Sequence, residues 1–128
     1  MALTSKRSKR KVSGGRYIGY RKKRIYEKRR LPVLTKLGNK IKKLKKTMGN
    51  KRKEVLFGAN EANVFIPQTK KHKVVKIKSV LENKANRHFV RRNIITKGTI
   101  VDTELGQAKI TSRPGQNGAI DAVLLKKK

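Results

Sequence analysis

The sequence predicts a mainly β protein: a small antiparallel β-barrel-like domain of six or seven short strands, preceded by an extended basic N-terminal arm. Three observations support this class. Short β-branched and apolar runs alternate with polar residues in the last two thirds of the chain. Gly, Pro and Asn separate these runs so closely that no crossover helix fits between them. The first part of the chain is rich in cations and poor in apolar residues.

The charge divides the chain in two. The 128 residues include 37 Lys and Arg against 7 Asp and Glu, a formal charge of +30. Residues 1–53 hold 22 of these cations and one acid, whereas residues 54–128 hold 15 cations and six acids. A segment with long like-charge runs and few apolar residues buries too little surface to offset its ordering entropy. We therefore expect a basic arm over residues 1–38, disordered when free, and one β-barrel-like domain over residues 39–128.

A charge this large on a small chain requires a polyanionic partner, and nucleic acid fits best because its phosphates release counterions to scattered Lys and Arg. A membrane surface is disfavoured, because no stretch reaches about 18 apolar residues and the basic run lacks an apolar face. Met1 to Lys11 do not form a secretory signal, so we expect a cytoplasmic protein. The absence of cysteine excludes disulfides, thiolate catalysis and Cys-ligated zinc.

Two features of the arm suggest contacts with RNA. The glycines of Ser13–Arg16 let the backbone approach a phosphate or simply make a flexible turn, and the turn is favoured because the motif matches no phosphate-binding fingerprint. Tyr17, Tyr20 and Tyr26 alternate with cations. They are equally suited to stack on bases while neighbouring cations neutralise phosphates, or to pack on the domain once the arm docks.

The domain begins with an ambiguous segment. Ile41, Leu44 and Met48 are spaced like one face of a cationic helix. Gly49-Asn50 follows at once, however, and alternating apolar residues come after it, so we predict a β-hairpin with strands near 40–47 and 52–58.

The rest of the domain shows strand periodicity. Val75 and Ile77 alternate with lysines, which indicates a strand buried on one side. Further strands are expected at residues 63–66, 75–81, 99–104, 108–111 and 119–125, with turns at 58–61, 67–70 and 105–106 and a loop at 114–118.

The chain shows little sign of catalysis, and we predict that it is not an enzyme. Asp102 and Glu104 lie on one face of the expected strand, where they could bind a divalent metal. In so cationic a chain the favoured interpretation is that they pair with Arg or Lys. His72 and His88 have no second ligand at zinc spacing, so no metal site and no cofactor are predicted.

Three separated motifs indicate a family. They are Ala85–Gly98 (ANRHFVRRNIITKG), Thr111–Gly118 (TSRPGQNG), and Gly14–Arg16 followed by Tyr20–Glu27 (YRKKRIYE). Together they resemble the small-subunit ribosomal protein family "eight-e" (S8e), which archaea and eukaryotes share and which is unrelated to bacterial S8. The resemblance spans nearly the whole chain. The short length and the intact Asn-Arg-His run resemble the archaeal form.

This resemblance implies a structural constituent of the small ribosomal subunit that binds and stabilises 16S-type rRNA through phosphate contacts. We expect Arg87, Arg91, Arg92 and Arg113 to clamp phosphates, and Asn86 and His88 to add hydrogen bonds. The arm is expected to fold on binding. The predicted RNA-binding residues are Arg16, Tyr20, Arg21, Lys22, Lys23, Arg24, Arg30, Asn86, Arg87, His88, Arg91, Arg92 and Arg113.

The expected partners are small-subunit rRNA and neighbouring small-subunit proteins, with no membrane and no small-molecule substrate. Two alternatives from other classes remain open. A general nucleic-acid chaperone or packaging protein would carry the same charge and would bind DNA and RNA equally. A nuclease or modifying enzyme would use Asp102 and Glu104 as its metal site.

Overall fold

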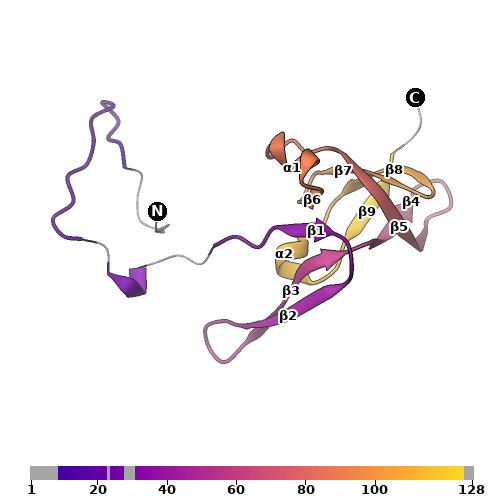
Figure 1. Ribbon diagram of the computed structural model, residues 1–128, viewed down its shortest axis with the longest axis horizontal. Helices are drawn as coiled ribbons and strands as arrows, with labels where there is room; N and C mark the ends of the chain where they lie inside the picture. The colour runs from indigo at the N-terminus through magenta and orange to yellow at the C-terminus, as the bar shows by residue number, and fades with distance from the viewer. Residues whose placement is uncertain (1–8, 23, 28–30, 126–128) are drawn as a thin grey trace. The chain divides into compact units, whose positions relative to one another are not determined.

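The computed structural model describes residues 9–22, 24–27 and 31–125 (Figure 1). The chain forms two compact units, Met1–Pro32 and Val33–Lys128. Within the described residues, the first unit contains one 3₁₀ turn, η1 (Ile25–Glu27), and the second contains nine strands and two helical turns. No helix in these described ranges is long and apolar enough to cross a membrane.

Five strands of the second unit close into a barrel in the order β4-β5-β7-β8-β9. Four of its ladders are antiparallel, and the parallel ladder between β4 and β9 closes the ring. Closure leaves no sheet edge on which the alternating residues would remain unpaired. The strands are β4 (Glu61–Ile66), β5 (Lys71–Glu82), β7 (Ile100–Thr103), β8 (Gly106–Ile110) and β9 (Asp121–Leu124).

The other four strands form a second sheet in the order β2-β3-β1-β6. The short β1 (Thr35–Leu37) runs parallel to β3 (Arg52–Ala59) and antiparallel to β6 (Ile94–Ile95). β2 (Ile41–Lys46) and β3 form a long hairpin. Thr35 is buried, and its hydroxyl donates a 2.7 Å hydrogen bond to the Leu56 carbonyl. A buried polar side chain thus joins β1 to its neighbour, and its hydrogen bond offsets the cost of removing the hydroxyl from water.

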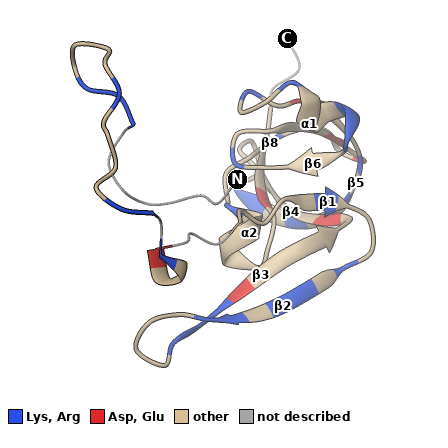
Figure 2. Ribbon diagram, turned by 60° about the vertical axis from the view of Figure 1, so that its left-hand side comes forward, with Lys and Arg blue, Asp and Glu red and all other residues tan. Residues whose placement is uncertain are grey.

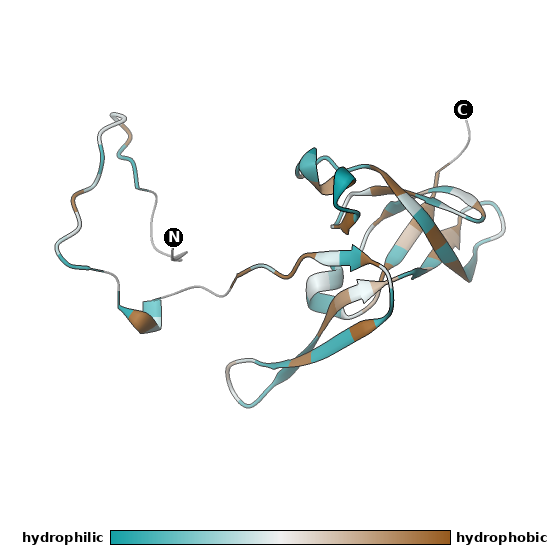
Figure 3. Ribbon diagram, in the orientation of Figure 1, coloured by the Kyte–Doolittle hydropathy of each residue, from teal (hydrophilic) through white to brown (hydrophobic). Residues whose placement is uncertain are grey.

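The two sheets share one hydrophobic core. Leu56 and Ala59 of β3 and Ile95 of β6 belong to the same buried cluster as Val64 and Val101 of the barrel. Each fully buried Val, Leu or Ile stabilises the fold by roughly 1.5–3 kcal/mol relative to exposure. Figure 3 shows apolar residues recurring along the barrel strands, while α1 is largely hydrophilic. The core therefore fixes both sheets and leaves α1 at the surface.

The mainly β class with a barrel is confirmed. The seven strands expected from the sequence correspond to β2, β3, β4, β5, β7, β8 and β9. The 40–58 hairpin is also confirmed, and the helical alternative for 40–48 is wrong: Gly49 and Asn50 both have positive φ, 69° and 59°, as a tight hairpin turn requires.

Other details differ from the expectation. β1 and β6 were not predicted, and two ladders, β1–β3 and β4–β9, are parallel. β1 also lies before residue 39, where the folded domain was expected to begin. Both extra strands are too short to show alternation, since they contain three and two residues.

Two stretches in which no helix was expected form single helical turns, α1 (His88–Arg91) and α2 (Pro114–Asn117). In α2, Pro114 supplies a helical φ at the first position, and Gly118 ends the turn at φ 66°. Proline at the first position of a four-residue stretch and glycine just after it favour a helical turn. The prediction of a loop at residues 114–118 did not use this signal.

Gly118 is expected to be more sensitive to alanine than Gly98, although both have positive φ, 66° and 86°. A Cβ at Gly118 would lie 2.7 Å from the Glu54 Cβ, whereas one at Gly98 meets nothing within 4 Å. We expect Gly98→Ala to cost about 1 kcal/mol from backbone strain, and Gly118→Ala about 2–3 kcal/mol because β3 must also shift. Urea unfolding followed by circular dichroism measures both, and equal costs would contradict the close packing of α2 on β3.

Candidate nucleic-acid interface

The α1 turn connects β5 to β6 and is defined by an asparagine at each end. The Asn86 side-chain oxygen accepts a 2.9 Å hydrogen bond from the His88 amide, and its carbonyl accepts one of 3.0 Å from the Phe89 amide. At the other end Asn93 adopts φ 49°, and its amide donates to the Val90 carbonyl. Asparagine suits both places because its side chain satisfies free amides and it tolerates positive φ. These hydrogen bonds give the Asn86–Asn93 stretch a defined local conformation.

The side chain of Asn83 joins the two ends of this loop. It is 5 % exposed, and its side-chain nitrogen donates to the Ile94 carbonyl at 3.2 Å. Its oxygen accepts from the Ala85 amide at 3.0 Å and from the Thr96 hydroxyl at 3.2 Å. One buried amide therefore connects the start of the loop to β6 and to the residue after it. Val90 of α1 packs against the hydrophobic core, and this contact holds the turn against the domain.

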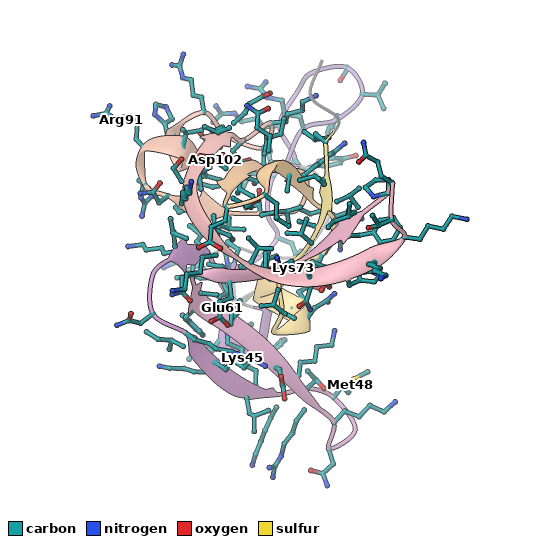
Figure 4. All side chains as sticks on the ribbon, turned by 90° about the vertical axis from the view of Figure 1, so that its right-hand side faces the viewer. Lys45, Met48, Glu61, Lys73, Arg91 and Asp102 are labelled. Atoms are coloured by element: carbon teal, nitrogen blue, oxygen red, sulfur yellow. The ribbon has the colours of Figure 1, made fainter. Side chains whose placement is uncertain are left out.

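Four basic or titratable side chains project from this fixed turn: Arg87, His88, Arg91 and Arg92, all exposed. No ion pair in the described part of the chain involves any of the three arginines. Figure 2 shows basic residues on α1, and in Figure 4 Arg91 points outward from the protein. The arrangement presents uncompensated guanidinium groups on a rigid backbone, a geometry suited to phosphate.

Arg113 lies on a different element. It is exposed immediately before α2, and its carbonyl accepts hydrogen bonds from the Gln116 and Asn117 amides. α2 packs on β3, whereas α1 contacts β5 and β6, and the two turns are separate in Figure 1. The structure thus brings together Asn86, Arg87, His88, Arg91 and Arg92 from the predicted set, but not Arg113. Within that group, Asn86 already has a structural role, because its side-chain oxygen accepts the hydrogen bond from the His88 amide at the start of α1.

In the first unit, residues 10–16 form a tight turn. Arg10 and Arg16 make an isolated antiparallel bridge, and the Lys11 amide donates to the Gly15 carbonyl at 2.7 Å. Gly14 adopts φ 82°, which allows the chain to reverse. This geometry favours the turn interpretation of Ser13–Arg16. Arg16 itself is exposed.

Tyr20, Arg21 and Glu27 form a second local cluster. The Arg21 guanidinium donates to the Tyr20 hydroxyl at 2.8 Å and to the Glu27 carboxylate at 2.7 Å. These hydrogen bonds raise the pKa of Arg21 above its ordinary value, so it stays cationic. Glu27 also accepts from the Arg24 amide at 3.2 Å, which closes η1. The arm's single acid therefore organises the turn that follows Tyr20.

The structure describes only some of the remaining arm residues that were predicted to bind RNA. Lys22 and Arg24 are exposed, whereas Lys23 and Arg30 lie outside the described residues. Tyr20 is 84 % exposed and Tyr26 79 %. The Arg21 guanidinium lies 5.1 Å from the Tyr20 ring centroid, so one face of this ring is paired with a cation.

The acidic pair does not form the expected ion pairs. Asp102 and Glu104 have no Lys or Arg within salt-bridge distance among the residues described. They line an open hollow at one end of the barrel together with Lys78. Within the same residues, no group of three or more His, Asp or Glu side chains is placed to hold a metal ion. His72 instead lies beside Phe65, with ring centroids 4.9 Å apart.

The β2–β3 hairpin is the basic surface that the site prediction missed. Residues 40–53 contain eight cations and no acid, and Figure 2 shows β2 as a largely basic strand. The hairpin was predicted as structure, but none of its cations was included in the predicted site. The signal was the run of lysines on both sides of Gly49-Asn50, because a hairpin brings such runs side by side.

Comparison with known proteins supports the family resemblance. Residues 4–125 match the model of the family described as ribosomal protein S8e. Small ribosomal subunit protein eS8 of Picrophilus torridus is 46 % identical over 125 residues, which cover 98 % of this chain and all of that protein. The protein of the same name from Sulfolobus acidocaldarius is 51 % identical over 118 residues, 91 % of this chain and 92 % of that one. Both are archaeal, as the motif pattern predicted. With its motifs in order and nearly its whole length matched, the chain belongs to the ribosomal protein S8e family.

Proposed function

We propose that this protein is a structural constituent of the small ribosomal subunit that binds and stabilises small-subunit rRNA by contacting its phosphates. It is a structural ribosomal protein of its family and not an enzyme. The proposed phosphate contacts are supported above all by the α1 turn. Its three exposed arginines have no acidic partner among the described residues and lie on a hydrogen-bonded loop. Prepositioned guanidinium groups bind phosphate with little loss of conformational entropy.

In this proposal Arg87, Arg91 and Arg92 clamp neighbouring phosphates in a fixed geometry. His88 extends from the same turn and adds a hydrogen bond to phosphate, 2′-hydroxyl or a base edge. Arg113 contacts a separate stretch of the RNA backbone, because it projects from a different element. Two contact regions on one rigid barrel would hold two segments of rRNA at a set distance.

The arm makes the second group of contacts in the proposal. Its RNA-binding residues would order on the RNA and pass between its helices, where the like charges that repel in the free arm are neutralised. Tyr20 and Tyr26 are exposed enough to stack on unpaired bases. The residues concerned are Arg16, Tyr20, Arg21, Lys22, Lys23, Arg24 and Arg30.

The proposed place of action is the ribosome in the cytoplasm, with rRNA and neighbouring small-subunit proteins as partners. No membrane and no small-molecule substrate enters this role. The general nucleic-acid chaperone is distinguished by its substrates, since such a protein binds DNA and RNA equally well. Filter binding to a small-subunit rRNA transcript and to a DNA of equal length separates the two.

Deletion of residues 1–32 is expected to leave the second unit folded and to weaken rRNA binding. The removed segment holds 13 cations, and each phosphate contact contributes about one unit to the slope of log K against log salt. The slope should therefore fall by several units between about 50 and 400 mM KCl. A chain with the same arm residues in shuffled order is the matched control. An unchanged slope on deletion would remove the arm from the interface, and full binding by the shuffled chain would reduce its role to charge alone.

A further inference from the structure

The β2–β3 hairpin carries a conflict in its own pairing. Lys45 lies directly opposite Lys53, and Lys46 directly opposite Arg52. Side chains at directly opposite positions have Cβ atoms about 5 Å apart on one face, so like charges there destabilise the hairpin. The conflict occurs twice in succession, once on each face of the ribbon, at the end nearest the turn. Such a segment gains most from a partner that brings negative charge to both faces.

The neighbouring β4–β5 hairpin shows that basic strands need not be built this way. There Lys71 faces Ile66, Lys73 faces Val64, and Lys76 faces Glu61. Among the named strands of the described residues, only β2–β3 sets cations directly opposite cations; outside them, the isolated bridge of the first unit pairs Arg10 with Arg16. Within the second unit the arrangement is therefore specific to one hairpin, and there it does not follow from the high charge of the chain alone.

Part of the charge on the hairpin is compensated within the protein. Lys42 pairs with Glu54 at 3.2 Å. Lys43 and Lys45 lie over the Phe57 ring, 5.2 and 5.5 Å from its centroid. Arg52 and Lys53 are exposed and take part in no ion pair within the described part of the chain. Figure 4 shows this end of the hairpin, marked by Met48, projecting from the barrel.

The composition of the hairpin selects the form of RNA. Residues 41–53 contain no aromatic side chain on which bases of a single strand would stack. Strands of six residues span about 20 Å, and the cations lie on both faces. A double helix offers phosphates on both sides of a groove, and the RNA minor groove is wide and shallow. Leu44 and Met48, 63 % and 94 % exposed, would be covered there by ribose and base edges.

We propose that the β2–β3 hairpin is a binding surface for double-helical RNA, lying along the minor groove with its cations on the phosphates of both strands. The inference rests on the proposed rRNA-binding function and adds to it a surface and a form of RNA. The polyanion removes the cross-strand repulsion, so binding and ordering of the hairpin end occur together.

The test compares two matched pairs of substitutions in the full-length protein. Arg52→Gln with Lys53→Gln neutralises two cations of the hairpin, and Lys71→Gln with Lys73→Gln neutralises two exposed lysines of β5. The probes are a 20-base-pair RNA duplex and one of its strands alone. We expect the hairpin variant to bind the duplex at least about tenfold more weakly at 0.1 M KCl, with a salt slope lower by about 2. The single strand should lose less affinity, and the control pair should stay within about twofold on both probes.

The hairpin variant should also melt at the same or a higher temperature than the wild type, because two like-charge pairs disappear. Hydrogen exchange on the wild type gives an independent reading: the duplex should protect amides of residues 43–53 more than those of β4 and β5. Equal losses in both variants, an unchanged duplex affinity, or binding of the hairpin to an acidic protein in its place would overturn the inference. If the wild type bound neither rRNA nor the duplex, the proposed function itself would fail.

Discussion

Replacing Arg87, Arg91 and Arg92 together by glutamine is expected to weaken binding to a small-subunit rRNA transcript by a hundred- to a thousandfold at about 0.1 M salt. Each phosphate contact contributes close to one power of ten at this salt concentration, because binding releases a condensed counterion. The three side chains are exposed and have no acidic partner within the described residues. Their removal should therefore change the unfolding free energy by less than about 0.5 kcal/mol each. Filter binding over a range of KCl concentrations measures the effect.

The matched control replaces the same three arginines by lysine. It keeps the charge but removes the planar fork, so the salt slope should persist while affinity falls by a smaller factor. If the glutamine variant unfolded, the arginines would belong to the structure of the loop. If it bound rRNA as the wild type does, α1 would lie outside the interface.

Asn83→Ala is expected to destabilise the second unit by about 3–5 kcal/mol and to impair rRNA binding at the same time. The substitution leaves the Ile94 carbonyl and the Ala85 amide without their partner in a buried site, and each unsatisfied group costs about 1–3 kcal/mol. For a domain of this size the melting temperature should fall by 10 °C or more. The binding defect follows because α1 loses its support. Thermal unfolding and rRNA binding below the melting temperature measure the two effects.

Asn86→Ala is the comparison. It removes one exposed hydrogen bond, to the His88 amide, and should cost only about 1 kcal/mol. Equal stability of the Asn83 and Asn86 variants would show that the buried amide does not hold the loop. Normal rRNA binding by a destabilised Asn83 variant would separate the position of α1 from RNA recognition.

Strands with local partners were predictable from the sequence. The two-residue period of Val75 and Ile77 and the turn at Gly49-Asn50 are visible in short windows, and both led to correct strands. β1 was not visible because its three residues acquire strand geometry only between β3 and β6. Parallel closure by β4 and β9 was missed for a related reason, since alternation reports which side of a strand is buried and carries no information about its direction.

The residue types of the candidate site could be predicted from the sequence, whereas the positions of these residues in the fold could be predicted only in part. The arginines of Asn86–Gly98 were recognised as RNA-binding candidates, but no helix was expected there. In the structure the Asn86 and Asn93 conformations fold them onto a helical turn. The sequence alone does not show that Arg113 lies apart from this turn, because that separation depends on how α2 packs against β3. The hairpin cations were passed over because their significance lies in the register, in which Lys53 faces Lys45.

The parallel β4–β9 ladder also sets the order in which the chain can mature. Asn63 pairs with Asp121, 58 positions later, so the ring closes only after β9 has been synthesised. Such distant pairing makes folding slow, on a scale of milliseconds to seconds. Until then the edges of β4 and β8 are open to strands of other chains. The large positive charge of the chain, +30 when it is complete, keeps two unfinished copies apart by repulsion. The charge suited to rRNA would thus protect the nascent barrel from aggregation before any RNA is bound.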